Sequence, residues 1–228
     1  MKLKIIFKTS FLLLISVSLY AQSSQNIQIG TQFPLQHFIS YENQFHPHWS
    51  VTAQAGVFTA PYKKMILKTL NIFCIDDALT SLLGDAVSSG VALQPTVKYH
   101  FKKNYFGFYY LWFSLKADES PRGALESYYN ISLPNPPGSS TITELYAKCK
   151  AHNIGIMYGR RFVLKNTKME LRTEIGIAKT LGSESTIFTE NHTFDAASQA
   201  VDVYLKDYLM EYGYVPTLNM MFVYKISN

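Results

Sequence analysis

Most of the chain alternates apolar and polar residues with a period of two, which is the pattern of β-strands with one apolar and one polar face. Tight turns follow the second, fourth and sixth strands of this pattern, whereas long gaps follow the third, fifth and seventh. Short turns at one end and long loops at the other are typical of transmembrane β-barrels. We therefore predict an all-β fold, an eight-stranded antiparallel up-and-down barrel that spans a membrane. The expected strands are residues 27–33, 36–45, 49–58, 90–101, 105–115, 150–163, 168–180 and 212–226.

The two faces of the predicted strands differ in chemistry. In 168–180, Met169, Ile175 and Ile177 share one face with other apolar residues, while charged residues share the opposite face with Gly176 and Ala178. A soluble sandwich would turn its apolar face inward, whereas the lumen of a small barrel suits the narrow polar face. The segment 105–115 is aromatic on both faces, so its orientation stays open. Prolines at 34, 95 and 216 limit or interrupt strands, because proline donates no ladder hydrogen bond.

Charged residues on the predicted lumen faces gather toward the end with the tight turns. If the turn after 150–163 pairs Val163 with Lys168, Arg161 lies directly opposite Glu170, and the two would form a charge-assisted pair. The cluster is either a structural polar plug or a selectivity ring or proton path. Eight strands leave an interior just wide enough for side chains, which favours the plug. The candidate cluster is Glu42, Lys98, Arg161, Glu170, Arg172, Glu174 and Lys225.

The amino terminus has the features of a secretory signal peptide. Lys2, Lys4 and Lys8 precede an apolar run at 11–19, and Ala21 offers a small residue for cleavage. The run is too short for a membrane helix, and no cysteine follows it to carry a lipid anchor. We expect a signal peptide at 1–21 and one outer-membrane barrel domain at 22–228, exported to the outer membrane.

Composition and motifs narrow the function. The net charge of +5 includes three lysines of the signal segment. The net charge of the rest of the chain is therefore too small to indicate a nucleic-acid partner. No G-x-S-x-G, H-E-x-x-H, C-x-x-C or P-loop pattern occurs, and His46 and His48 around a proline make a weak metal pair. We expect no enzyme, no cofactor and no metal. Cys74 and Cys149 either form a disulfide between two loops or stay apart, with Cys74 as a buried thiol.

The long loops are expected to contain structure of their own. Apolar residues recur at helical spacing within 62–73, 79–87 and 197–209, whereas 134–140 is rich in proline and glycine and indicates irregular structure. The helices either pack on each other as a lid over the barrel mouth or form a docking surface for a partner.

The chain resembles the small, porin-like outer-membrane β-barrel proteins of Gram-negative bacteria, whose function is uncharacterised. The resemblance rests on the signal peptide, the hairpin at 98–105, the strand end at 158–162 and the carboxy-terminal strand at 218–224. It implies outer-membrane lipid around the barrel and contact with the barrel-assembly machinery during biogenesis. That machinery reads a terminal aromatic residue in the family, which here would be Tyr224, or else Ile226.

Two functions remain open at this stage. The first is a closed structural or interaction barrel whose extracellular loops bind a protein partner at the surface or in a membrane complex. The alternative is a narrow porin-like barrel or a transport barrel for an apolar solute. A lipid-modifying enzyme is the less favoured third hypothesis. Paired opposite charges in the lumen favour closure, whereas a ring of one sign would favour conduction.

Overall fold

The computed structural model describes residues 24–58, 87–117, 146–164, 168–188 and 213–227, together with a few residues between 199 and 211. The predicted signal peptide, Cys74, the helices expected within 62–73 and 79–87, and the irregular segment 134–140 lie outside these residues. Between 199 and 211 the described residues are helical, but the apolar positions of the helix expected there lie outside them. Cys149 is a free thiol.

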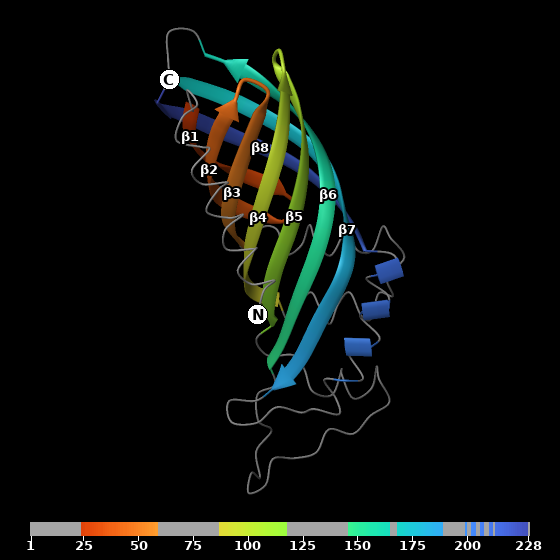
Figure 1. Ribbon diagram of the computed structural model, residues 1–228. Helices are drawn as coiled ribbons and strands as arrows, with labels where there is room; N and C mark the ends of the chain where they lie inside the picture. The colour runs from red at the N-terminus through yellow and green to blue at the C-terminus, as the bar shows by residue number, and fades with distance from the viewer. Residues whose placement is uncertain are drawn as a thin grey trace, which may run out of the picture.

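Eight antiparallel strands form a closed barrel in which each strand pairs with its neighbours in the chain and β8 pairs with β1 (Figure 1). This is the predicted up-and-down fold. The strands are β1 (Ser24–Phe33), β2 (Gln36–His46), β3 (Trp49–Phe58), β4 (Val87–Phe101), β5 (Asn104–Ala117), β6 (Tyr146–Val163), β7 (Met169–Phe188) and β8 (Tyr214–Ser227).

The wall of the barrel is taller along β5, β6 and β7 than along β1, β2 and β3. The short strands have 10 or 11 residues, about the length that crosses a bilayer when tilted, whereas β6 has 18 and β7 has 20. Figure 1 shows β6 and β7 continuing past the ends of the other strands. The extra residues therefore extend beyond the membrane, at the end where the long connections leave the barrel.

The turns and prolines fit this arrangement. Pro47 and His48 join β2 to β3, and Lys102 and Lys103 join β4 to β5, at the same end of the barrel. Pro34 lies in the short β1–β2 turn at the opposite end. Pro95 pairs with β3 but has no partner on β5, and Pro216 lies beyond the part of β8 that pairs with β1. Each proline thus stands where a ladder hydrogen bond is missing, and the register shifts lie elsewhere.

The outside of the barrel is apolar and aromatic. Many isoleucines, valines and aromatic side chains that point away from the lumen are between 39% and 63% exposed, whereas many glutamines and charged side chains are buried inside. This is the reverse of a soluble protein and matches the lipid-facing band of a membrane barrel. The chain is therefore a membrane-spanning β-barrel. Among the described residues, no helix is both long enough and apolar enough to cross a bilayer.

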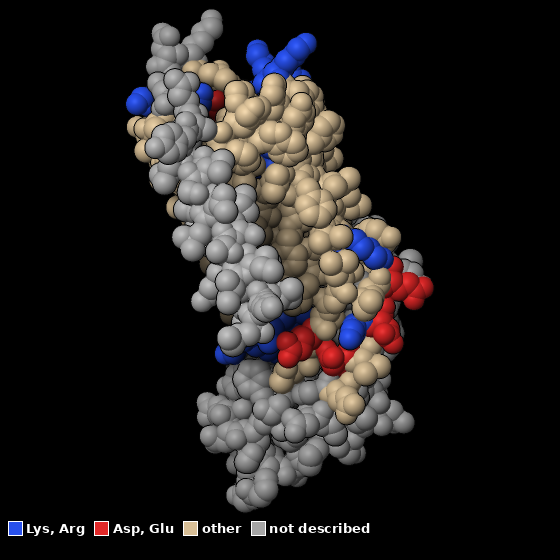
Figure 2. All heavy atoms as spheres, in the orientation of Figure 1, with Lys and Arg blue, Asp and Glu red and all other residues tan. Residues whose placement is uncertain are grey.

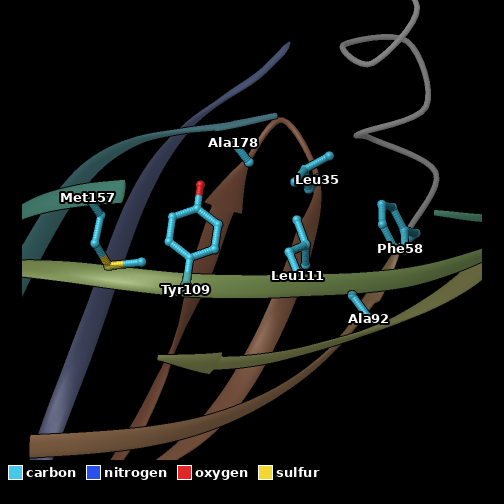
Figure 3. Packing of buried hydrophobic residues seen from close by; sticks show 7 residues of the cluster. All are labelled: Leu35, Phe58, Ala92, Tyr109, Leu111, Met157 and Ala178. Atoms are coloured by element: carbon cyan, nitrogen blue, oxygen red, sulfur yellow. The ribbon is translucent and has the colours of Figure 1, made fainter. Parts of the chain in front are cut away.

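The lumen half nearest the long connections is filled by apolar side chains (Figure 3). Leu35 comes from the β1–β2 turn, Phe58 from the end of β3 and Leu111 from β5. Ala92, Tyr109, Met157 and Ala178 complete the buried cluster, and Phe113, Leu115 and Val215 pack against it. The alternation of residues along the strands predicts a polar lumen but not this apolar half.

Candidate functional site in the barrel lumen

The lumen half nearest the tight turns contains a network of charged side chains, centred on Glu42 of β2 and Arg172 of β7. Nη1 of Arg172 lies 2.9 Å from both carboxylate oxygens of Glu42, and Nε of Arg172 lies 3.0 Å from Oε2 of Glu170. β2 and β7 are not neighbours in the barrel, so the Arg172–Glu42 pair crosses the lumen. Both side chains are at most 1% exposed.

Glu42 is held on every side. Its carboxylate accepts hydrogen bonds from Asn26 Nδ2 at 3.0 Å, Gln28 Nε2 at 3.1 Å and Thr52 Oγ1 at 3.3 Å. Nζ of Lys98 lies 3.5 Å from Oε2. A buried carboxylate is tolerated only when paired and hydrogen-bonded, and here its partners come from β1, β3, β4 and β7.

Glu174 of β7 is a second centre of the same network. Oε1 accepts from Lys98 Nζ at 2.9 Å and from the Tyr105 hydroxyl at 2.7 Å, and Oε2 accepts from Asn219 Nδ2 at 2.6 Å. Lys98 therefore joins the two centres. At the tight-turn end of the lumen, Nζ of Lys225 lies 2.8 Å from Oε1 of Glu170. Lys225 is the partly exposed residue of the network.

Of the seven predicted lumen residues, six form this network and Arg161 does not. The predicted pairing of Arg161 with Glu170 is wrong, because the register places Val163 opposite Glu170 and Arg161 opposite Arg172. The prediction paired Val163 with Lys168, so the register of β6 on β7 differs from it by two residues. A shift by two residues keeps every side chain on its face but changes its partner. Arg161 instead donates from Nη2 to the carbonyl of Lys102 at 2.9 Å.

Tyr105 settles the orientation of β5, which the sequence left open. Tyr105, Gly107, Tyr109 and Leu111 face the lumen, whereas Phe106 and Phe108 face outward. Tyr105 lies opposite Gly159 of β6, which in turn lies opposite Glu174 of β7. A Cβ at Gly159 would collide with the Tyr105 ring, so this glycine lets the tyrosine cross β6 and reach Glu174. Nζ of Lys98 lies 4.9 Å from the Tyr105 ring centroid, which adds a cation–π contact.

A layer of glutamines separates the charged network from the apolar half. Gln32 Nε2 donates to Gln94 Oε1 at 3.1 Å, while Gln36 and Gln54 donate to Gln32 Oε1. All four are buried. In the sequence these four glutamines are only polar residues on the predicted lumen faces. Their contacts with one another can be identified only from the folded structure.

Long side chains and neighbouring strands lie close against the glycines of the barrel wall. An added Cβ would lie under 3.0 Å from another atom at each of seven glycines of the barrel wall. Gly155 is covered by Tyr109, Gly107 by Met157 and Gly56 by Gln36. Long side chains thus occupy the space that the small residues leave. The seven glycines are Gly30, Gly56, Gly90, Gly107, Gly155, Gly159 and Gly176.

Ser50 and His100 form a hydrogen-bonded pair at the base of the lumen, with Oγ 2.8 Å from Nε2. A catalytic histidine is usually oriented by an acid on its other nitrogen. Within the described part of the chain, Nδ1 of His100 has no hydrogen-bond partner. The pair therefore lacks the third member of a triad. The described part of the chain also contains no group of three His, Cys, Asp or Glu side chains placed to bind a metal.

Comparison with solved structures shows the same fold elsewhere. A major outer membrane protein from Thermus thermophilus is similar with a TM-score of 0.50 and 11% identity, covering 90% of this chain and 99% of that one. Acinetobacter baumannii CarO and CarO2 have TM-scores of 0.41 and 0.40, with 7% and 8% identity over 91% and 90% of this chain and 99% and 98% of theirs. No protein-family model and no curated protein matches the chain. The likeness to the Thermus protein shows the fold of an outer-membrane β-barrel, in agreement with the location predicted from the sequence.

Proposed function

We propose that the chain is an integral barrel of the bacterial outer membrane whose lumen is closed, and that it acts through its long loops as a structural or interaction barrel rather than as a pore. The observation that carries this proposal is the Arg172–Glu42 pair. It crosses the lumen between non-adjacent strands and is at most 1% exposed.

The balance of charge supports closure. The network contains three carboxylates, from Glu42, Glu170 and Glu174, and three cations, from Lys98, Arg172 and Lys225. Ion-selective pores are lined by rings of one sign that exchange partners with passing ions. Here each charge is already bound to an opposite one, so a passing ion finds no free ligand.

The position of the loops supports an interaction role. All three long connections leave the same end of the barrel, opposite the tight turns, and this end faces the cell exterior in outer-membrane barrels. We propose a surface protein or a larger membrane complex as the partner at this end. Lipid surrounds the apolar band, and the barrel-assembly machinery reads the β8 end, where Tyr224 and Ile226 both face outward and are exposed.

A second candidate function has one observation in its favour. The apolar cluster around Leu35, Phe58 and Leu111 offers an apolar solute a compatible surface at the loop end of the lumen. Transport would still require the solute to pass the glutamine layer and the charged network. A solute that enters from the loop end must therefore leave sideways or displace both layers.

Solute flux into proteoliposomes tests the proposal. Liposomes with the refolded barrel should swell in isosmotic arabinose no faster than protein-free liposomes. A variant with Glu42→Ala and Arg172→Ala removes the pair that crosses the lumen and should swell faster. Rapid swelling with the wild type would contradict a closed barrel. Entry of an apolar dye without sugar entry would favour the second candidate.

A further inference from the structure

Four cationic residues gather at the tight-turn end of the barrel, where the β4–β5 turn lies beside the end of β6. We call Lys102, Lys103, Arg160 and Arg161 the turn cluster. Asn104 pairs with Arg160, and the backbone N–H of Arg161 donates to the Lys103 carbonyl at 2.8 Å. Figure 2 shows Lys and Arg side chains projecting from this end, at the top of the view.

No exposed carboxylate balances the turn cluster within the described residues. The acids nearest this end, Glu42 and Glu170, are at most 1% exposed and are bound within the lumen. The described acids that are at least partly exposed, Glu184, Asp202, Asp207 and Glu211, belong to the loop end. Like charges at neighbouring strand ends repel each other, so the arrangement favours an anion between them.

Arg161 has a buried hydrogen-bond donor for which the described residues provide no acceptor. Its Nη2 donates to the Lys102 carbonyl at 2.9 Å, but its Nε is buried and has no hydrogen-bond partner in the described part of the chain. Buried donors without an acceptor are rare in folded proteins. Lys102 has a φ of 56°, a conformation that favours glycine or asparagine, yet the position carries a lysine.

Aromatic side chains place the turn cluster at a particular depth. On the outer wall next to it, the ring centroids of Phe101 and Phe106 lie 5.3 Å apart, as do those of Phe106 and Tyr158. Phe162 lies beneath the guanidinium of Arg160, at 5.5 Å. Aromatic girdles mark the membrane interface, so cations just beyond them lie at the level of the lipid phosphates.

We propose that the turn cluster binds the headgroup phosphate of an anionic phospholipid in the membrane leaflet on the tight-turn side. Arginine and lysine side chains are the usual protein partners of phosphate, and Lys102, Lys103 and Arg160 are exposed at this end. The site requires a membrane-inserted barrel but not a closed lumen. Failure of this proposal would therefore leave the closed barrel untouched.

Native mass spectrometry of the refolded full chain in detergent tests the site. Phosphatidylglycerol and phosphatidylcholine with identical acyl chains are titrated against the wild type, a K102Q/K103Q/R160Q variant and a K116Q/K148Q/K206Q variant. The last removes the same charge from the loop end and is the matched control. Arg161 is left in place because it holds the turn.

The wild type should bind phosphatidylglycerol more tightly than phosphatidylcholine, and the turn-cluster variant should lose about tenfold in phosphatidylglycerol affinity. The loop-end control should keep the wild-type preference. Equal affinity of the wild type for the two lipids, or equal loss in both variants, would overturn the proposal. Competition by inorganic phosphate as effective as that by phosphatidylglycerol would also overturn it, because the occupant would then be a soluble anion.

Discussion

Among single residues, Glu42 has the most side-chain partners in the lumen. It lies within hydrogen-bond or ion-pair distance of five side chains from four other strands. Its removal would leave Arg172 and Lys98 with one carboxylate fewer in a space that water hardly reaches. The strength of the network therefore depends more on this carboxylate than on any partner alone.

Glu42→Ala should lower the free energy of unfolding by about 3–5 kcal/mol, and by less where water enters the lumen. Adding Arg172→Ala should cost less than the sum of the two single changes, because the unpaired cation is removed as well. Urea unfolding of the barrel in lipid vesicles, followed by the fluorescence of Trp49 and Trp112, measures both quantities.

The control for this cycle is the exposed Lys150–Glu184 pair, with an N–O distance of 2.9 Å. Glu184→Ala should cost at most about 1 kcal/mol, because solvent screens the pair. A Glu42→Ala cost no larger than this would show that the lumen network contributes little to stability.

Gly159 is the second residue whose identity the fold requires. Gly159→Ala should displace the Tyr105 ring and break its bond to Glu174, with a loss of about 1–3 kcal/mol. Gly182→Ala is the matched control, because an added Cβ there meets no atom within 4 Å. The same unfolding measurement applies. Equal effects of the two substitutions would refute the close contact between Tyr105 and Gly159.

The partners of Arg161, Glu170 and Arg172 could not be predicted from the sequence. Alternation placed Glu170 and Arg172 correctly in the lumen, because the side-chain period of a strand is two. It did not identify their partners, because the position of the β6–β7 turn along the chain sets the register. The pairing of Arg172 with Glu42 joins residues 130 positions apart and follows only from barrel closure.

At the scale of elements, strands were predicted well where membrane and lumen impose opposite chemistry on the two faces. β3 has the predicted bounds, 49–58, and β2 differs by one residue. β7 extends to Phe188 rather than ending at residue 180, and β6 begins at Tyr146 rather than at 150. Beyond the membrane the outer face carries Lys148, Lys150 and Glu184. The apolar alternation disappears there although the ladder continues.

The orientation of the strands predicts which connections reach the cell surface. An epitope tag inserted at 136–140 should bind antibody on intact cells, because the β5–β6 connection leaves the loop end. A tag at 102–104 should bind only after the outer membrane is permeabilised. Immunofluorescence on intact and permeabilised cells makes the comparison, and the reverse pattern would show that the barrel is inserted the other way.

At the scale of the whole molecule, the lumen contains three layers of different chemistry, which we propose close it. A charged network, a glutamine layer and an apolar cluster follow one another from the tight-turn end to the loop end. The eight-strand count and the charged residues together led to the expectation of a plug. The apolar layer was missed because Leu35, Phe58 and Leu111 meet only when distant strand ends close the barrel. The binding of a partner by the long loops is still a prediction.

Single-channel recording in planar lipid bilayers tests the closed lumen most directly. The wild-type barrel should insert without conductance steps, whereas the variant carrying Glu42→Ala and Arg172→Ala should show small, flickering steps because the pair that crosses the lumen is gone. Insertion is verified by the reduced electrophoretic mobility of the same preparation after heating. Steady, ion-selective conductance of the wild type would contradict the account and identify the charged network as the lining of a pore.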